Sequence, residues 1–212
     1  MKGLAPHTAQ LFERIAALEC IKPFVLVGGT ALSLQLGTRM SEDLDFMKWR
    51  TSKDERMEVN WPVIMHELES IGIVENMNLM DFDHVEFIVD GVKLSFYAAD
   101  RYAPPIQSIP ILYNLHIADI KAIGAMKMEV LLRRANFRDY YDIYSILQAG
   151  ENLQEMMQMA LEHSGHRLKS KQLIALLTNG TRFNRDSHFE QMAPIYSVSP
   201  MEIEEYIKGQ LK

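Results

Sequence analysis

The stretch Phe24-Val25-Leu26-Val27-Gly28-Gly29-Thr30, followed by Asp43-Leu44-Asp45-Phe46, decides the fold of this chain. The first part predicts an apolar strand that ends in a glycine pair. The second predicts a strand with two carboxylates on one side, because residues two apart in a strand point to the same face. Two like charges this close are costly unless a cation lies between them. Two hard oxygen ligands suit Mg²⁺, which completes its shell with water and substrate phosphates.

The glycine pair favours a phosphate-binding turn, since glycine lets the backbone approach phosphate oxygens and the following helix offers free N–H groups. Each feature alone is weak, because most Asp-x-Asp pairs are solvated strand ends and most Gly-Gly pairs are plain turns. Their order is specific: an apolar strand, Gly28-Gly29, a short helix, a loop with Arg39 and Ser41, and the acidic strand. This order resembles the signature of the DNA polymerase β-like nucleotidyltransferase superfamily.

A second group of charges lies at a predicted helix junction, between Lys127 and Asp142. Asp139 and Asp142 are three apart, so they share one face in the first turn of a helix, where the macrodipole favours negative charge. One interpretation is a capped helix start, with Arg138 as a surface ion-pair partner and Lys127 as a solvated lysine. The other is a second set of active-site residues.

Together, the two segments resemble the AbiEii/AbiGii toxin family of nucleotidyltransferases. The match covers roughly residues 20 to 150 in order and spacing, including the Arg-Asp-x-x-Asp core that ends at Asp142. The resemblance implies that the Gly28-Gly29-Thr30 turn holds the triphosphate of an NTP. It also implies that Asp43 and Asp45 bind Mg²⁺ or Mn²⁺.

The resemblance further implies a second active-site block, with Lys127 near the nucleotide phosphates, where a compact charge on a flexible stem suits the task. The remaining members of this block are Arg138, Asp139 and Asp142. We add Arg39 and Ser41, from the loop before the acidic strand, as candidates for nucleotide binding.

The chain departs from the superfamily at a third carboxylate, which usually comes from a later strand beside the Asp-x-Asp strand. The best candidate strand spans residues 92–97, entered by the Asp-Gly turn at 90–91, and places Ser95 at that position. A hydroxyl neither supplies the negative charge nor acts as a base near neutral pH. Three alternatives stay open: two acids suffice, with or without help from Asp139 or Asp142, Glu86 substitutes, or the protein has lost some activity.

Composition agrees with a cytoplasmic protein, because no apolar run approaches the roughly 20 residues of a membrane span and the N-terminal stretch lacks a signal peptide's apolar core. The single Cys20 fits a small buried hydrophobe better than a nucleophile. The net charge of −6 disfavours broad nucleic-acid binding, which usually needs a basic protein. A small contact through Arg133, Arg134 and Arg138 remains open.

The expected fold class is α+β. A small mixed sheet with flanking helices forms a nucleotidyltransferase core over residues 1–110, and a helical bundle follows over 111–212. The predicted strands are 23–27, 42–48, 73–79, 84–89 and 92–97. The predicted helices are 8–20, 30–36, 54–71, 115–134, 137–148, 151–163, 168–178 and 199–209. Pro104-Pro105 and Pro110 mark the linker.

The leading functional hypothesis is transfer of a nucleoside monophosphate from an NTP to an acceptor. The family resemblance implies a toxin of a toxin–antitoxin or phage-defence system, with a cognate antitoxin as partner and tRNA or another RNA as acceptor. One alternative is an enzyme acting on a small molecule of the aminoglycoside type. The other is a catalytically silent homologue that binds a nucleotide or a protein.

Overall fold

The structure is a computed structural model that describes residues 2–102, 107–165, 167–185 and 187–211. The chain divides into two units. Unit 1 consists of Met1–Leu34 and Ser41–Asp119, and unit 2 consists of Gln35–Met40 and Ile120–Lys212. Within the described residues, no helix is long and apolar enough to cross a membrane.

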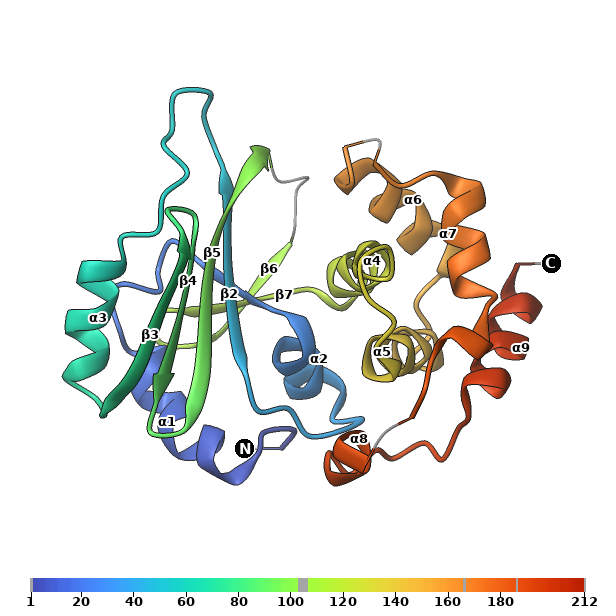
Figure 1. Ribbon diagram of the computed structural model, residues 1–212, viewed down its shortest axis with the longest axis horizontal. Coiled ribbons are helices and arrows are strands. Elements are labelled where there is room, and N and C mark those ends of the chain that lie inside the picture. The colour runs from blue at the N-terminus through green and yellow to red at the C-terminus, as the bar shows by residue number, and fades with distance from the viewer. Residues whose placement is uncertain (1, 103–106, 166, 186, 212) are drawn as a thin grey trace. The chain divides into compact units, whose positions relative to one another are not determined.

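Unit 1 is built on one seven-stranded mixed sheet with the order β3-β4-β5-β2-β1-β7-β6 (Figure 1). Strand β2 runs parallel to β5 and β1 runs parallel to β7, while the other neighbouring pairs are antiparallel. The mixed α+β class predicted from the sequence is therefore confirmed. The strands are β1 Val25–Val27, β2 Leu44–Arg50, β3 Val74–Asp81, β4 His84–Val89, β5 Val92–Tyr102, β6 Ser108–Leu112 and β7 Leu115–Ala118.

The core of unit 1 centres on Phe96, which follows from the alternating apolar pattern of the central strands. Its ring stacks on Phe46 at 4.9 Å between centroids and meets the edges of Phe24 and Phe87. All four rings are buried, and burying one such side chain contributes roughly 2 kcal/mol. Phe46 thus faces this core, and the opposite face of β2 carries Asp45, Met47 and Trp49.

Three helices begin in unit 1: α1 Pro6–Ala16, α2 Gly28–Leu36 and α3 Trp61–Glu69. Helix α1 contacts β5 and α3 contacts β3 (Figure 1). The prediction of one helix over 54–71 was wrong for its first part. Helix α3 begins only at Trp61, with Pro62 in its first turn, where a proline needs no N–H partner.

Unit 2 is helical. Helix α4 contacts both α5 and α6, and α5 contacts α9. The first turns of two helices are closed by side-chain caps: Asn152 accepts from the backbone of Glu155, and Ser199 forms a capping box with Glu202. The elements are α4 Ile120–Val130, α5 Phe137–Gln148, α6 Leu153–His163, α7 Ser170–Leu177, η1 Gly180–Arg182, α8 Ser187–Gln191 and α9 Pro200–Gln210.

The segment before α4 differs from the sequence prediction. Residues 115–118 form strand β7 rather than the start of a helix, and Ser108–Leu112 pairs with it as β6. Pro110 lies within β6, which stands at one end of the sheet, where a proline is tolerated. Pro104 and Pro105 lie outside the described residues. The sheet unit consequently extends to Asp119.

Candidate functional site

Asp43 and Asp45 lie at the N-terminal end of β2, Asp43 immediately before the strand and Asp45 within it. Leu44 is fully buried between them, whereas both aspartates are half-buried, so the strand turns its apolar side to the core and its carboxylates away from it. Asp45 lies opposite Val27 of β1 and opposite Ser95 of β5. The acidic strand predicted over 42–48 is therefore present from Leu44 onward, and it includes Asp45 but not Asp43.

Gly28 brings the backbone turn against one of these carboxylates. Its φ of +72° is a conformation that L side chains rarely adopt, and a Cβ atom at this position would lie 2.9 Å from the Asp45 Oδ2 atom. Helix α2 begins at Gly28, so the free N–H groups of its first turn lie at this turn. A glycine is required here both by the backbone and by the space that Asp45 occupies.

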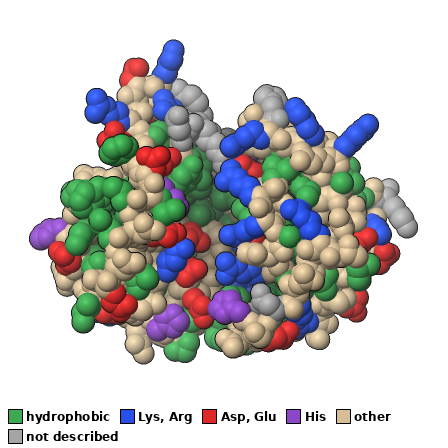
Figure 2. Space-filling model, in the orientation of Figure 1, with side chains coloured by type: hydrophobic (Ala, Val, Ile, Leu, Met, Phe, Trp, Pro, Cys, Tyr) green, Lys and Arg blue, Asp and Glu red, His purple; other side chains and the backbone are tan. Residues whose placement is uncertain are grey.

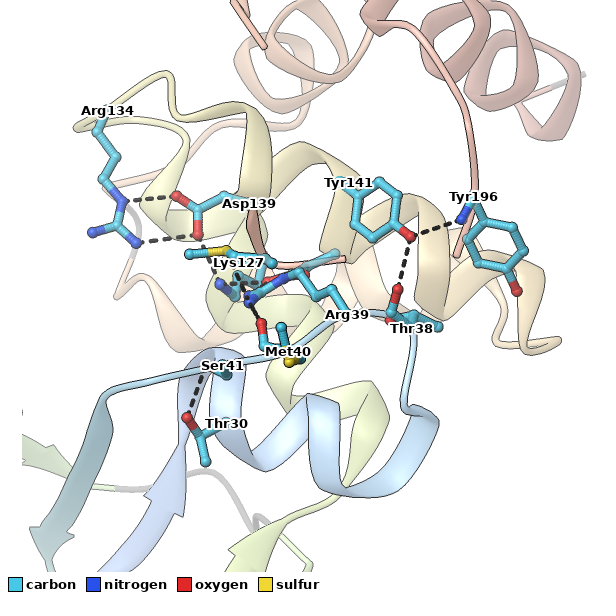
Figure 3. Close-up of polar contacts among 12 residues, drawn as sticks. Thr30, Thr38, Arg39, Met40, Ser41, Lys127, Arg134, Asp139, Tyr141 and Tyr196 are labelled. Atoms are coloured by element: carbon cyan, nitrogen blue, oxygen red, sulfur yellow. Dashed lines mark hydrogen bonds and ion pairs between the residues drawn. The ribbon is translucent and has the colours of Figure 1, made fainter. Parts of the chain in front are cut away.

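Thr30 fixes the backbone that leads into the Asp pair. Its buried hydroxyl donates to the carbonyl oxygen of Asp43 and lies 2.9 Å from the hydroxyl of Ser41 (Figure 3). The Ser41 side chain is buried as well. In the structure, then, both side chains are engaged within unit 1 and hold the turn.

The N-terminal segment supports the same backbone, which the sequence did not indicate. The N–H of Ser41 donates to Gly3, and the N–H of Ala5 donates to Ser41, each at 3.0 Å. The Thr8 hydroxyl donates to the carbonyl oxygen of Glu42 at 2.7 Å. The available signal was a threonine on the buried face of an amphipathic helix, where its hydroxyl needs a partner.

The strands beside the Asp pair carry Ser95 and Glu86. Ser95 pairs with Asp45 across β2 and β5, and Glu86 pairs with Ser95 across β4 and β5. Glu86 is one strand further away, and its Oε1 atom lies 2.8 Å from the Lys93 Nζ atom. Among the residues that the structure describes, no group of three or more His, Cys, Asp or Glu side chains is arranged to hold a metal ion.

In unit 2, Lys127 joins the two aspartates of the downstream segment. Its Nζ atom lies 2.7 Å from Asp139 Oδ1 and 2.8 Å from Asp142 Oδ2. All three side chains are buried, so Lys127 is not a solvated lysine. Figure 3 shows Lys127 directed toward Asp139. The helical spacing that puts both aspartates on one face of α5 also lets one ammonium group from α4 reach both.

Two arginines complete this cluster. Arg39 makes a bidentate pair with Asp142, with Nε–Oδ1 and Nη2–Oδ2 distances of 2.7 and 2.8 Å. Arg134 makes a second bidentate pair with Asp139, at 2.7 and 3.1 Å. The five side chains alternate in sign, three cations to two anions, and carry one positive charge in excess. We call them the charge cluster of unit 2: Arg39, Lys127, Arg134, Asp139 and Asp142.

Both carboxylates of the charge cluster are ionised despite their burial. Burial alone would raise the pKa of Asp139, but Lys127 and Arg134 outweigh it and hold that pKa far below its usual range. For Asp142, Arg39 and Lys127 likewise outweigh burial, so its pKa is lowered. A buried carboxylate without such partners would instead take up a proton.

The loop that carries Arg39 is anchored within unit 2. The carbonyl oxygen of Thr38 accepts hydrogen bonds from the Tyr141 hydroxyl and from the backbone of Ile195, each at 2.9 Å. The N–H of Met40 donates to the carbonyl oxygen of Met192 at 2.7 Å. Arg39 is thus held at both its backbone and its side chain, and its guanidinium is nearly inaccessible to solvent. Sequence spacing gave no indication of these partners.

A sequence profile of the family described as "Nucleotidyl transferase AbiEii toxin, Type IV TA system" matches residues 10–202, which is most of the chain. The chain belongs to this AbiEii nucleotidyltransferase family. The resemblance stated from the two motifs is therefore confirmed. A relative from Aquifex aeolicus (strain VF5), the protein aq_aa25, is 23% identical over 218 residues, covering 100% of this chain and 98% of its own length.

Solved structures share the fold of this AbiEii family member. JHP933 from Helicobacter pylori superposes with a TM-score of 0.57 at 19% identity, covering 98% of this chain and 91% of its own. MenT4, the nucleotidyltransferase toxin Rv2826c from Mycobacterium tuberculosis H37Rv, superposes with a TM-score of 0.58 at 15% identity, covering 97% and 82%. At these identities the likeness establishes the architecture.

Arg138 of this AbiEii family member stands apart from the charge cluster. It lines a pocket of about 300 Å³ with Asn136, Phe137, His188, Phe189 and Met192. The sequence suggested an ion pair between Arg138 and Asp139, but the cationic partners of Asp139 are Lys127 and Arg134. Arg134, three residues before the start of α5, is the partner of Asp139 that the sequence interpretation overlooked.

Proposed function

We propose that this protein transfers a nucleoside monophosphate from an NTP to an acceptor, with Mg²⁺ or Mn²⁺ as cofactor and release of pyrophosphate. The observation that carries the proposal is the Asp43–Asp45 pair at the N-terminal end of β2, with Gly28, at the start of α2, in close contact with Asp45. Membership of a nucleotidyltransferase family supports the reaction, and we propose that the metal–triphosphate complex is held at this turn.

The residues present fit one hard divalent cation. Asp43 and Asp45 offer carboxylate oxygens from one face of a strand, and the missing Cβ of Gly28 leaves room beside Asp45. When bound, the cation would neutralise charge on the phosphates that face it. The N–H groups of the first turn of α2 would donate to the triphosphate, and Thr30 and Ser41 would keep that turn in place.

We propose that the charge cluster serves the same reaction. Its excess positive charge suits an anionic ligand, and Lys127 uses two of its three N–H donors on Asp139 and Asp142, which leaves one for a phosphate oxygen. Arg39, Asp139 and Asp142 would position the ammonium. Transfer forms a bond between the acceptor oxygen and the α-phosphorus and breaks the bond to the β-phosphate, and the hydroxyl proton passes to water.

We propose an RNA acceptor such as tRNA, and a toxin role held in check by a cognate antitoxin in the cytoplasm. Unit 2 supports the first part, since Lys and Arg side chains gather over its surface (Figure 2). Arg133 and Arg167 are well exposed there, and each lies near Glu129. Phosphate groups of a nucleic acid are the ligands that such side chains attract. The match to a toxin of a toxin–antitoxin system supports the antitoxin. We extend the proposal to a part in phage defence.

The test is incubation with each NTP labelled at the α-phosphate, with Mg²⁺ and with total RNA, total protein or a small-molecule extract as acceptor. Label in RNA supports the proposal, and label in small molecules would point to an aminoglycoside-type acceptor. The Asp45→Asn variant is the matched control, because it removes one ligand and preserves shape. Label in protein would refute the RNA acceptor.

Ser95 beside Asp45 favours one other function, a silent homologue that binds nucleotide without transferring it. That alternative predicts NTP binding with no label in any acceptor. Equilibrium binding of an NTP, measured on the same preparation, separates it from an inactive or misfolded sample.

A further inference from the structure

Lys93 lies on the side of the sheet that carries Asp45. Strand β5 runs parallel to β2, with Leu94 opposite Leu44 and Ser95 opposite Asp45. One residue earlier on each chain, Lys93 therefore falls beside Asp43. Because side chains alternate along both strands, Lys93 and Ser95 point to the side on which Asp43 and Asp45 stand.

The ammonium group of Lys93 is held in place and stays charged. Its Nζ atom lies 2.8 Å from Glu86 Oε1, and the same oxygen is 3.8 Å from His84 Nε2. The hydrogen bond that Lys93 donates to Glu86 raises the pKa of Lys93. Burial opposes the rise, whereas the charges of Glu86, Asp43 and Asp45 add to it. The aspartates thus lie within the electric field of a fixed cation.

This arrangement leaves little place for a second metal ion. The described residues hold no third acid or histidine grouped with Asp43 and Asp45, and the position opposite Asp45 is a serine. Glu86, on the strand beyond Ser95, already pairs with the Lys93 ammonium. A second divalent cation at this face would have to displace that ion pair and would be repelled by the ammonium.

We propose that Lys93 takes the place of a second metal ion: Asp43 and Asp45 hold one divalent cation, and the Lys93 ammonium supplies the other positive charge. This inference rests on the proposed nucleotidyl transfer. Lys93 donates a hydrogen bond to a non-bridging oxygen of the α-phosphate and stabilises the charge that develops there, with no covalent step of its own. It is a catalytic residue in this scheme, and Glu86 positions it.

The first measurement is the number and affinity of Mn²⁺ ions bound per chain, from the spin-resonance signal of free Mn²⁺, without nucleotide. The wild type should bind one ion at the Asp pair. Lys93→Met should still bind one ion but about tenfold more tightly, because a competing positive charge is gone. Lys48→Met is the matched control, since Lys48 lies on β2 with its ammonium 5.8 Å from the Phe24 ring centroid, on the apolar face.

The second measurement is turnover at saturating metal and NTP. Lys93→Met should lower kcat about a hundredfold although it holds the metal more tightly, and Lys93→Arg should restore part of the loss, because charge is the property in question. Lys48→Met should leave both readouts near the wild type. Lys93 is partly exposed, so Lys93→Met should fold, which thermal unfolding verifies.

Two Mn²⁺ ions in the wild type overturn the inference, and so does Mn²⁺ affinity in Lys93→Met that equals that of Lys48→Met. Full turnover in Lys93→Met overturns it as well. These outcomes leave the proposed function standing if the wild type transfers label. A wild type that transfers nothing refutes the proposed function instead, whatever the metal count.

Discussion

The two units each present a pair of aspartates, but the pairs differ in their surroundings. Asp43 and Asp45 are half-buried, with one lysine beside them, and Gly28 keeps space open next to Asp45. Asp139 and Asp142 are completely inaccessible and are neutralised by three cations of the chain itself. The first pair, which we call the open pair, therefore suits an external cation, whereas the second, which we call the closed pair, already holds internal ones.

The net charges of the units show the same contrast. Unit 1 has nine Lys and Arg against seventeen Asp and Glu, a net charge of −8, and unit 2 has thirteen against eleven, a net charge of +2. The net charge of the whole chain, −6, conceals this division. Net charge therefore disfavours nucleic-acid binding by unit 1 but not by unit 2.

The largest expected effect is on transfer, when the open pair loses a carboxylate. Asp43→Asn or Asp45→Asn should reduce nucleotidyl transfer by roughly a thousandfold or more, because a lost metal ligand removes several kcal/mol of transition-state stabilisation. Folding should survive, since each change relieves like-charge repulsion. Labelled-NTP assays and thermal unfolding with and without Mg²⁺ measure both. Unfolding of either variant would show that the pair is structural.

The closed pair should respond in the opposite way. Asp142→Asn leaves Arg39 and Lys127 buried without their shared partner, which should lower the free energy of unfolding by roughly 3–5 kcal/mol. Urea denaturation measures the loss. Arg39→Met alone should cost a similar amount, and the double variant should cost less than the sum, because both remove one interaction. If the two losses in free energy of unfolding added up fully, Arg39 and Asp142 would not depend on one shared interaction.

Acid should act on the closed pair. The pKa values of Asp139 and Asp142 are lowered in the folded chain, so below the ordinary aspartate pKa of about 4 the unfolded chain binds more protons than the folded one. Their contribution to stability is thus complete above about pH 4 and is lost as the pH falls further. Urea denaturation over this range should show a shallower acid loss for the Arg39→Met/Asp142→Asn variant. An unchanged slope would contradict the assignment.

The next prediction adds, at Ser95, the third carboxylate that is usual in the superfamily. Ser95→Asp places a third carboxylate opposite Asp45 and should tighten Mn²⁺ binding about tenfold, since it adds a hard oxygen ligand. Calorimetric titration measures the affinity. Ser95→Asn is the control, because an asparagine side chain has the size of an aspartate without its charge. Equal affinities in the two variants would show that the position does not face the metal.

The smallest effect is expected at the turn. Gly28→Ala introduces a Cβ atom 2.9 Å from Asp45 Oδ2 at a φ of +72°, which should cost about 1–2 kcal/mol of stability. It should also weaken the stabilisation of the folded protein by Mg²⁺, because the Asp45 carboxylate must move. Gly91→Ala is the control for φ alone, because its φ is +74° and no atom lies within 4 Å of its added Cβ. Equal behaviour of the two variants would argue against a role for the Asp45 contact.

Local patterns predicted much of the fold. The helix over 137–148 and the strand over 84–89 have the predicted bounds, because their periodicity is set by backbone geometry alone. Strands β6 and β7 were missed, since Pro110 argued for a linker and only the edge position of β6 accommodates it. The predicted helix over 54–71 began too early, because the charged residues before Trp61 do not contradict a helical period.

The sequence by itself determined that Asp43 and Asp45 share one face, that a glycine turn precedes them, and that Asp139 and Asp142 share another face. These are consequences of short-range geometry. Only the tertiary structure decided that Arg39 closes on Asp142, 103 residues away, that Lys127 is buried between two carboxylates, and that Lys93 lies beside the open pair. Partners and burial depend on long-range packing and strand register, which no local pattern encodes.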